Sequence, residues 1–221
     1  MPYRINLLLD AARRLGIIVR MELPIIVLAA GQSSRMRGTD KLLEQVDGRP
    51  LLRRQVELAR AASEAGVIVA LPVAPHPRYD TLQGLDATCV AVPDASLGRM
   101  ASLRRALRAL PAGSPAVMVL LADLPDLTAD DLAAVLRAVD LSTDVQIWRG
   151  VTGAGAPGHP VVIRDTLFPA IDPLTSDDDA KILMRAAKGR VAFCPLPGGH
   201  ACADLDTPED WAAWRSRNPG R

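Results

Sequence analysis

A short basic loop follows the first apolar run of the chain. The run at 24–30 is continuous and rich in β-branched residues, which is typical of a strand buried on both faces. The polar segment at 31–40 begins with Gly31 and includes Arg35, and Lys41 follows it. Glycine lets the backbone approach an anion, successive N–H groups can surround it, and cationic side chains add charge. The loop therefore predicts a site for a triphosphate at the carboxyl end of a strand.

The same loop has a simpler interpretation. It does not match the phosphate-binding Walker A motif, because Gly38 is followed by Thr39 and not by lysine. A surface loop whose basic side chains are solvated would account for the composition equally well. On the residues of the loop alone, both interpretations stay open.

Carboxylates occur at two further places where an extended run ends. Asp123 follows the apolar run at 117–122, and Asp204 and Asp206 precede Thr207, a residue type that commonly begins a helix. Mg²⁺ prefers one or two carboxylates together with phosphate oxygens and water, so these side chains could hold it. The alternative is structural, because an aspartate at the end of a strand or the start of a helix often serves a turn or a cap.

The sequence of the loop resembles a known signature. Residues 28–36 are Leu-Ala-Ala-Gly-Gln-Ser-Ser-Arg-Met, and residues 41–43 are Lys-Leu-Leu. These segments are similar to the signature of the molybdenum cofactor nucleotidyltransferases, and most of all to the CTP:molybdopterin cytidylyltransferase branch and its relatives. The guanylyltransferase branch usually has a second glycine at the position of Ala30. Arg37 departs from the family's Arg-Met-Gly spacing.

Three further segments resemble motifs of this family. Residues 119–125, Val-Leu-Leu-Ala-Asp-Leu-Pro, are similar to its metal-binding Ala-Asp-Met-Pro, with Leu124 in place of methionine. Residues 204–210, Asp-Leu-Asp-Thr-Pro-Glu-Asp, are similar to its closing Asp-Ile-Asp-Thr-Pro-Glu-Asp. Residues 98–103, Gly-Arg-Met-Ala-Ser-Leu, resemble Gly-Met-x-x-Ser-Leu, which meets the nucleotide base. The motifs occur in the family's order, and the resemblance covers residues 24–212.

The segments expected near the acceptor match less evenly. Residues 155–161, Gly-Ala-Pro-Gly-His-Pro-Val, look like the Gly-x-Pro-Gly-His-Pro segment that lines the acceptor side. Residues 176–181, Ser-Asp-Asp-Asp-Ala-Lys, align with Gly-Asp-x-Gly-Ala-Arg but lack both glycines. Lys181 stands where arginine would offer a forked grip on phosphate. This departure supports another phosphorylated acceptor as the alternative to molybdopterin.

The resemblance implies roles for individual residues. The ligands of Mg²⁺ would be Asp123 and Asp206. The catalytic residues would be Arg35, Lys41 and Asp123. The nucleotide-binding residues would be Leu28, Ala29, Ala30, Gly31, Ser33, Arg35, Lys41, Gly98 and Ser102. The acceptor-binding residues would be Gly158, His159, Pro160, Asp177 and Lys181.

The resemblance also implies a reaction. We expect transfer of a nucleoside monophosphate, most of all CMP from CTP, to a phosphorylated acceptor, most of all molybdopterin, with release of pyrophosphate. The acceptor phosphate is already a nucleophile near neutral pH, so catalysis would rest on positioning and charge stabilisation. A molybdoenzyme or its maturation factor is a further partner that the resemblance implies. Two alternatives stay open: the same chemistry on a sugar or alcohol phosphate, and a maturation factor that binds the cofactor without catalysis.

The elements that must position these side chains alternate along the chain. We expect strands at 24–30, 67–71, 88–92, 117–122, 145–148 and 191–194. We expect helices at 51–65, 100–110, 178–187 and 208–215, and one that begins at Thr128 with Asp131 as its reciprocal cap. The glycine-rich segment at 150–158 is expected to be a mobile loop. The alternation predicts an α/β fold, a Rossmann-like three-layer α/β/α arrangement with a mostly parallel sheet, and the resemblance implies the nucleotide-diphospho-sugar transferase type.

The composition narrows the class of protein. The 221 residues include 26 lysines and arginines and 25 aspartates and glutamates, and a net charge of +1 disfavours nucleic acid as a partner. The three cysteines lack Cys-x-x-Cys spacing, so neither a disulfide framework nor a zinc site is expected.

No run is apolar enough for a membrane span, and we expect a cytoplasmic protein. Residues 1–22 are interpreted as an extension, helical or untranslated, and residues 23–217 as one nucleotidyltransferase domain.

Overall fold

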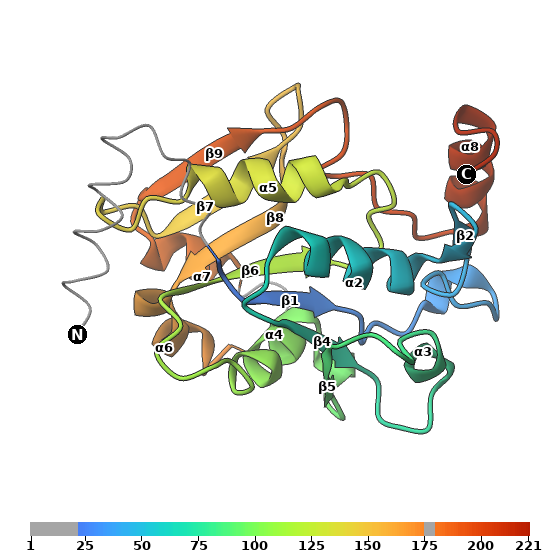
Figure 1. Cartoon of the computed structure of the whole chain (residues 1–221), viewed down its shortest axis with the longest axis horizontal. Helices are drawn as coiled ribbons and strands as arrows, with labels where there is room; N and C mark the ends of the chain where they lie inside the picture. Colours follow the sequence, from blue (N-terminus) through green and yellow to red (C-terminus); the bar gives the residue numbers. More distant parts are fainter. Residues whose placement is uncertain (1–21, 175–179) are drawn as a thin grey trace.

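A seven-stranded sheet forms the centre of the protein (Figure 1). The computed structural model describes residues 22–174 and 180–221. The order of the strands across the sheet is β5-β4-β1-β6-β8-β7-β9. The bounds of these strands are β1 Ile25–Leu28, β4 Val67–Leu71, β5 Thr88–Ala91, β6 Ala116–Leu121, β7 Ile147–Val151, β8 Pro157–Arg164 and β9 Val191–Pro195.

One strand runs against its neighbours. β1 pairs in parallel with β4 and β6, β4 with β5, and β7 with β9, whereas β8 is antiparallel to both β6 and β7. The predicted, mostly parallel sheet is therefore confirmed. In the β1 ladder, Leu28 pairs with Ala70 on one side and with Leu121 on the other. The carboxyl ends of three strands thus lie side by side, which is where ligands bind in sheets of this kind.

The segment at 150–158 is not the loop that the sequence predicts. Its first two residues belong to β7, its last two belong to β8, and a hydrogen bond from the Thr152 N–H to the Ala156 carbonyl (2.9 Å) closes the turn between them. Gly158 lies inside β8, where an added Cβ would be 1.9 Å from the carbonyl oxygen of Ala201. The glycines therefore mark strands that other backbone approaches closely, and not a free loop.

Helices cover both faces of the sheet. α2 and α5 lie on one face, and α4, α6 and α7 lie on the other (Figure 1). Separate apolar clusters fill the two spaces between helices and sheet, so the predicted three-layer α/β/α arrangement is confirmed. The bounds of the helices are η1 Ser34–Met36, α2 Leu51–Ala62, α3 Pro77–Asp80, η2 Ala95–Leu97, α4 Arg99–Leu107, α5 Ala129–Ala138, η3 Asp165–Leu167, α6 Phe168–Ile171, α7 Ala180–Ala186 and α8 Pro208–Arg217.

Two of the helices begin at the caps that the sequence predicts. The Thr128 hydroxyl accepts the N–H of Asp131, and the Asp131 carboxylate accepts the N–H of Thr128, which forms a capping box at the start of α5. Thr207 and Asp210 form the same box at the start of α8. A cap of this kind stabilises a helix by about 1 kcal/mol. The second box also fixes where α8 begins, two residues after Asp206.

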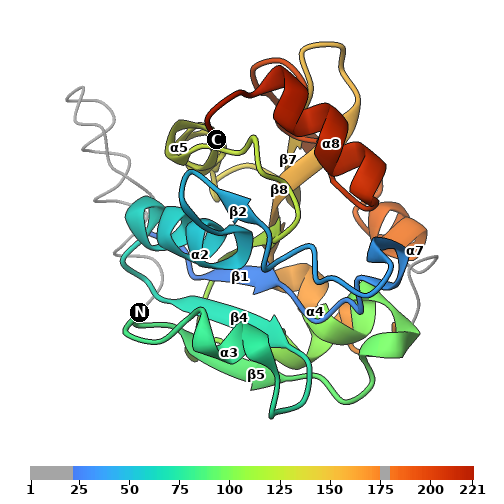
Figure 2. The same cartoon turned by 90° about the vertical axis from the view of Figure 1, so that its right-hand side faces the viewer.

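A hairpin and a helix lie together at one end of the sheet. The hairpin of β2 (Gln45–Val46) and β3 (Arg49–Pro50) and helix α8 lie beyond the carboxyl end of β1, on the right in Figure 1. Figure 2 looks onto this end.

Within the two described ranges, no helix combines the length and the apolarity needed to cross a membrane.

Candidate active site

A cavity of about 330 Å³ opens where β1 and β6 end. We call it the loop cavity. It contains every predicted catalytic and metal-binding residue, and every predicted nucleotide-binding residue except Ser33. The residues that line it are Leu28, Ala29, Ala30, Gly31, Arg35, Lys41, Leu42, Ala95, Gly98, Arg99, Ser102, Leu121, Asp123, Asp204 and Asp206.

Lys41 lies between two carboxylates in the loop cavity. Its Nζ is 2.5 Å from Asp123 Oδ2 and 2.6 Å from Asp206 Oδ1, and its side chain is 13% exposed. Arg35 Nη2 is 2.7 Å from the other oxygen of Asp206. We call Lys41, Asp123 and Asp206 the charged cluster. The fold thus brings three segments that are distant in the sequence to one point: the loop after β1, the end of β6 and the start of α8.

The carboxylates of the charged cluster stabilise the protonated form of Lys41. Burial lowers the pKa of Lys41, but the charges and hydrogen bonds of Asp123 and Asp206 outweigh burial and raise that pKa above its ordinary value of 10.5. Burial raises the pKa of the neighbouring Asp204, and the negative charges of Asp123 and Asp206 add to this effect. Lys41 is therefore a permanent cation, and the carboxylates around it favour additional positive charge.

The residues of the cluster fit a divalent cation. Asp123 Oδ1 is buried and has no hydrogen-bond partner among the described residues, so it offers an unused lone pair beside Asp206. The described ranges contain no group of three His, Cys, Asp or Glu side chains arranged to hold a metal. Mg²⁺ needs no such cage, because it binds through one or two carboxylates and takes its remaining ligands from phosphate and water.

Backbone hydrogen bonds hold the two carboxylates together. The Ala122 N–H donates to the Leu28 carbonyl (3.2 Å), which joins the ends of β6 and β1. The Leu205 N–H donates to the carbonyl of Asp123 (3.3 Å). The N–H of Asp206 donates to the Asp210 carboxylate (3.2 Å), next to the capping box of α8. The separation of Asp123 and Asp206 therefore depends on these main-chain donors and on the Asp210 carboxylate.

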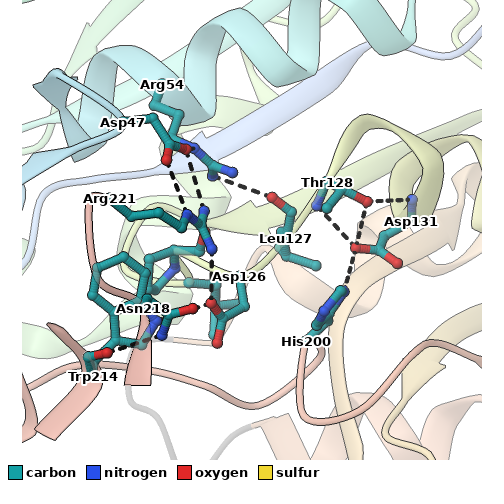
Figure 3. Close-up of polar contacts among 12 residues, drawn as sticks. Asp47, Arg54, Asp126, Leu127, Thr128, Asp131, His200, Trp214, Asn218 and Arg221 are labelled. Atoms are coloured by element: carbon teal, nitrogen blue, oxygen red, sulfur yellow. Dashed lines mark hydrogen bonds and ion pairs between the residues drawn. The ribbon is translucent and has the colours of Figure 1, made fainter. Parts of the chain in front are cut away.

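A second set of contacts anchors α8 to the rest of the site (Figure 3). Arg221 Nε is 2.9 Å from an oxygen of Asp47, in the β2–β3 hairpin, and Arg221 Nη1 is 3.4 Å from Asp126. The Trp214 indole of α8 donates to the same oxygen of Asp126 (2.9 Å). Because Asp126 follows closely after Asp123, these contacts fix α8, and with it Asp206, against the end of β6.

Ser33 does not line the loop cavity, although the sequence suggests a nucleotide contact. Its hydroxyl donates to Asp40 (3.0 Å) and accepts from the guanidinium of Arg78 (3.1 Å), beneath the loop. Arg78 is 1% exposed, and the sequence gives no sign of its role because it is a single arginine in a proline-rich stretch after β4. Ser33 thus shapes the loop from below.

Arg99 is a second residue that the sequence interpretation misses. It lines the loop cavity as the first residue of α4. Gly98 before it has a φ of 115°, a conformation that favours glycine and turns the chain into the helix. An arginine at the start of a helix that faces a basic loop is the signal that could have identified it.

A second cavity, of about 170 Å³, lies between the sheet and helices α4 and α7. We call it the sheet-face cavity. It adjoins the loop cavity, since Leu28, Arg99 and Leu121 line both. The other lining residues are mostly aliphatic: Met100, Leu103, Val119, Ile147, Arg149, His159, Val161, Ile163, Leu183 and Met184.

His159 is the neutral polar group of the sheet-face cavity. Burial lowers its pKa to about 4, so the imidazole is uncharged near neutral pH. Its Nδ1 lies 3.3 Å from the carbonyl oxygen of Val119. A carbonyl can only accept, so Nδ1 bears the proton and Nε2 has a lone pair. The ring can therefore accept a hydrogen bond from a bound molecule.

The other predicted acceptor residues are dispersed. Gly158 and Pro160 are buried in β8 and line neither cavity. Lys181 is exposed on α7, whose next turn contributes Leu183 to the sheet-face cavity. Asp177 lies outside the described residues. Of this predicted group, His159 alone lines a described cavity.

A third cavity, of about 340 Å³, lies on the other side of the Gly31 loop. We call it the side cavity. It shares Ala30, Gly31 and Ala95 with the loop cavity, so the two adjoin. Its lining is free of acidic and strongly basic side chains and consists of Ala30, Gly31, Gln32, Pro72, Val73, His76, Val92, Pro93, Ala95 and Ser96.

Known proteins resemble this chain over most of its length. The bifunctional protein GlmU of Pseudomonas syringae pv. syringae is 32% identical over 200 residues, which is 90% of this chain but 41% of GlmU. The purine catabolism protein PucB of Bacillus subtilis is 27% identical over 199 residues, covering 84% of this chain and 92% of PucB. The crystal structure of Rv0371c from Mycobacterium tuberculosis has a TM-score of 0.74 and 25% identity, and covers 88% of this chain and 97% of that one.

A family model matches the part of the chain that forms most of the site. The model describes a MobA-like NTP transferase domain, and it matches residues 25–191, from β1 into β9. The match contains the loop after β1, Asp123 and strands β1 to β8, and it ends at the first residue of β9, so Asp206 lies after it. This chain belongs to the MobA-like NTP transferase family of nucleotidyltransferases.

Proposed function

We propose that this protein transfers a nucleoside monophosphate, with CMP from CTP favoured, to a phosphorylated acceptor, with molybdopterin favoured. The reaction would require Mg²⁺ and release pyrophosphate. The observation that supports this proposal most strongly is the charged cluster, in which Lys41 is shared between Asp123 and Asp206 beside the Gly31 loop. A protein that only binds a cofactor has little need for two carboxylates held around a cation at a strand end.

The chemistry is an in-line displacement at phosphorus. An oxygen of the acceptor phosphate attacks the α-phosphorus, and the bond from that phosphorus to the oxygen that bridges the α- and β-phosphates breaks. Pyrophosphate leaves with the electron pair of that bond. The attacking phosphate is already anionic, so the step needs no general base, and catalysis depends on alignment and on stabilising the negative charge.

The residues of the loop cavity suit this task. The backbone near Gly31 can bind the triphosphate, and Arg35 and Arg99 can neutralise its charge. Asp123 and Asp206 would hold Mg²⁺, which would supply positive charge to the phosphates. Lys41 would then leave the carboxylates for the phosphates, because the divalent cation replaces the charge that Lys41 now supplies.

The side cavity is the place for the base. Its lining has no Asp, Glu, Lys or Arg side chain, which suits a neutral heterocycle, and Gln32 and Ser96 can form hydrogen bonds with the base edge. Ala30 lies where this cavity meets the loop cavity, and its methyl group takes space that a glycine would leave open for a purine. These features support CTP over GTP.

The sheet-face cavity is the place for the body of the acceptor. It adjoins the charged cluster through Leu28 and Arg99, so an acceptor lodged there could extend its phosphate toward the α-phosphorus. The lone pair on His159 Nε2 can accept one N–H or O–H group of the acceptor. A sugar phosphate would leave several hydroxyls without partners among aliphatic side chains, which makes it the weaker candidate.

Release of pyrophosphate tests the proposal. The purified protein is given each of the four common nucleoside triphosphates with Mg²⁺ and molybdopterin, and we expect release with CTP above the others. If CTP reacts only with a different phosphorylated acceptor, the reaction class holds and molybdopterin does not. If molybdopterin binds and no pyrophosphate forms with any nucleotide, the protein is a non-catalytic maturation factor.

A variant of Lys41 tests the site itself. Lys41→Ala should lower kcat by roughly 100-fold or more, because the developing phosphate charge loses a positioned donor. Arg137→Ala, on the exposed side of α5, is the control and should react as the wild type does. Full turnover by Lys41→Ala would remove this lysine from the mechanism.

A further inference from the structure

A buried arginine connects the two ends of the loop that follows β1. Arg78, in α3, donates from Nε and Nη2 to the two oxygens of Asp40, both at 2.7 Å. Its Nη1 donates to the carbonyl oxygen of Ala29 at 2.6 Å. Ala29 is the first residue after β1, and Asp40 is the residue before Lys41. One guanidinium thus fixes where the loop starts and where it ends.

The same network includes the middle of the loop. Ser33 accepts a hydrogen bond from Arg78 Nη2 (3.1 Å) and donates one to Asp40 Oδ1 (3.0 Å). The Leu42 N–H donates to the same oxygen of Asp40 (3.0 Å). Burial raises the pKa of Asp40, but the hydrogen bonds and charge of Arg78, together with the hydrogen bonds from Leu42 and Ser33, outweigh burial and lower that pKa below its ordinary value. Four donors therefore converge on Asp40, directly beside the lysine of the charged cluster.

The arginine also joins the two walls of the side cavity. Gly31 and Gln32, in the loop, form one wall, and Pro72 and His76, in the segment that leads to α3, form part of the other. Arg78 lies behind both walls and lines neither the loop cavity nor the side cavity. Its hydrogen bonds to the loop are the described polar contacts that tie this segment to the loop.

We propose that Arg78, acting through Asp40, is a positioning residue that sets the width of the side cavity and the place of Lys41. The proposal rests on the proposed function only in taking the side cavity as the site of the nucleotide base. A buried ion pair contributes little to stability compared with apolar side chains of the same volume, so its geometry is the more plausible reason for its presence. Lysine could not replace it, because a single ammonium cannot reach three separate acceptors in the plane of a guanidinium.

Nucleotide binding tests the proposal without any acceptor. Titration calorimetry with Mg²⁺ gives the Kd of CTP and of GTP for the wild type and for Arg78→Lys. We expect the Kd of the preferred nucleotide to rise roughly tenfold or more, since sub-ångström shifts of a positioning element have effects of this size. We also expect the ratio of the two Kd values to move toward one. Asp40→Asn should give the same changes, and the double variant should add little to either.

Arg164→Lys is the matched control. Arg164 donates to the carbonyl oxygens of Leu141 and Thr143, both at 2.8 Å, and it pairs in the sheet with Ala116 at the opposite end of β6 from the site. The substitution should lower Tm, as Arg78→Lys does, and leave both Kd values unchanged. If Arg78→Lys lowers Tm but binds both nucleotides as the control does, Arg78 is only structural and the proposal is wrong.

Two further outcomes are decisive. If Arg78→Lys does not fold, Ser33→Ala takes its place, because it removes two hydrogen bonds of the network and keeps the ion pair. It should weaken nucleotide binding in the same direction. Unchanged binding by Ser33→Ala would then overturn the proposal. If the wild type binds no nucleotide with Mg²⁺, the proposed function fails, and the role of Arg78 fails with it. If the wild type binds nucleotide and the variants bind it with the same Kd, only the role of Arg78 is overturned.

Discussion

The loop cavity and the sheet-face cavity adjoin each other and differ in chemistry. The first contains Arg35 and the charged cluster, where Lys41 lies within 2.6 Å of both carboxylates. The second is mostly aliphatic, and its histidine is neutral near pH 7. Charge is therefore concentrated where a phosphorus–oxygen bond would change, and an apolar surface is kept where an acceptor body would rest. Under the proposed function, the loop cavity would stabilise charge and the sheet-face cavity would recognise the acceptor.

Their places in the fold explain the difference. The charged side chains follow strand ends, where the chain leaves the sheet and polar groups can converge. The apolar side chains of β6, β7 and β8 that line the sheet-face cavity lie on one face of the sheet and belong to the core beneath α4. Arg99 lines both cavities and stands at their boundary.

The largest effect is expected from removing a charge of the cluster. Asp123→Asn should lower kcat by roughly 100- to 1000-fold, because the metal loses a carboxylate whose second oxygen has no other described partner. Pyrophosphate release is the measurement, and a chelator should abolish it in the wild type. Asp130→Asn, exposed in the first turn of α5, is the control. Normal turnover by Asp123→Asn would show that the charges are only structural.

The next effect concerns metal binding without nucleotide. Lys41 occupies the space between Asp123 and Asp206, so Lys41→Met should bind free Mn²⁺ roughly tenfold more tightly, the scale of a hydrogen bond between charged groups. Electron paramagnetic resonance measures the free ion directly, with no catalytic turnover. Arg137→Met should bind as the wild type does. Weaker binding by Lys41→Met would mean that the lysine organises the carboxylates instead of competing for them.

A smaller effect is expected in the apolar cavity. The pKa of His159 is about 4 in the folded protein against an ordinary value of 6.5, so the unfolded chain binds the proton more strongly between these values. The stability that this neutral ring contributes is complete above pH 6.5 and is lost as the pH falls toward 4. Urea unfolding gives the free energy of unfolding at pH 7 and at pH 4.5. The loss of this free energy between the two pH values should be about 1–2 kcal/mol smaller for His159→Gln than for the wild type. Equal pH dependence would indicate an ordinary, solvated histidine.

The smallest effect is expected at the junction with the side cavity. Ala30→Gly removes one methyl group and should raise kcat/KM for GTP relative to CTP by roughly threefold to tenfold. This lies at the low end of the discrimination that a single methyl or methylene group provides in a pocket. Paired assays of pyrophosphate release with the two nucleotides give the ratio. Ala109→Gly, in the turn after α4, tests for a general loss of stability. An unchanged ratio would place base selection elsewhere.

The sequence predicts the charged half of the site well. Strand β1, the loop after it and Asp123 lie within short segments whose apolar runs and motif residues are adjacent in the chain. The start of α8 follows from Thr207 and Asp210, because a capping box is local. The loop cavity gathers these residues as the resemblance implies, although their individual roles stay predictions.

The apolar half is harder to predict. β8 begins Pro-Gly-His-Pro, a composition that indicates a turn, and its strand structure comes from pairing with β6 and β7. Arg78 is a similar case, because its partners Asp40 and Ala29 lie 38 and 49 residues earlier in the chain. Long-range packing decides both, and no local pattern reports it.

A crystal structure with CTP and Mn²⁺ tests the central claim most directly. Anomalous scattering locates the metal without regard to the rest of the density. We predict a Mn²⁺ peak between Asp123 and Asp206, the triphosphate on the Gly31 loop, and Lys41 turned from the carboxylates to the phosphates. A nucleotide bound outside the loop cavity, with Lys41 still bridging the two carboxylates and the metal elsewhere, would contradict the account.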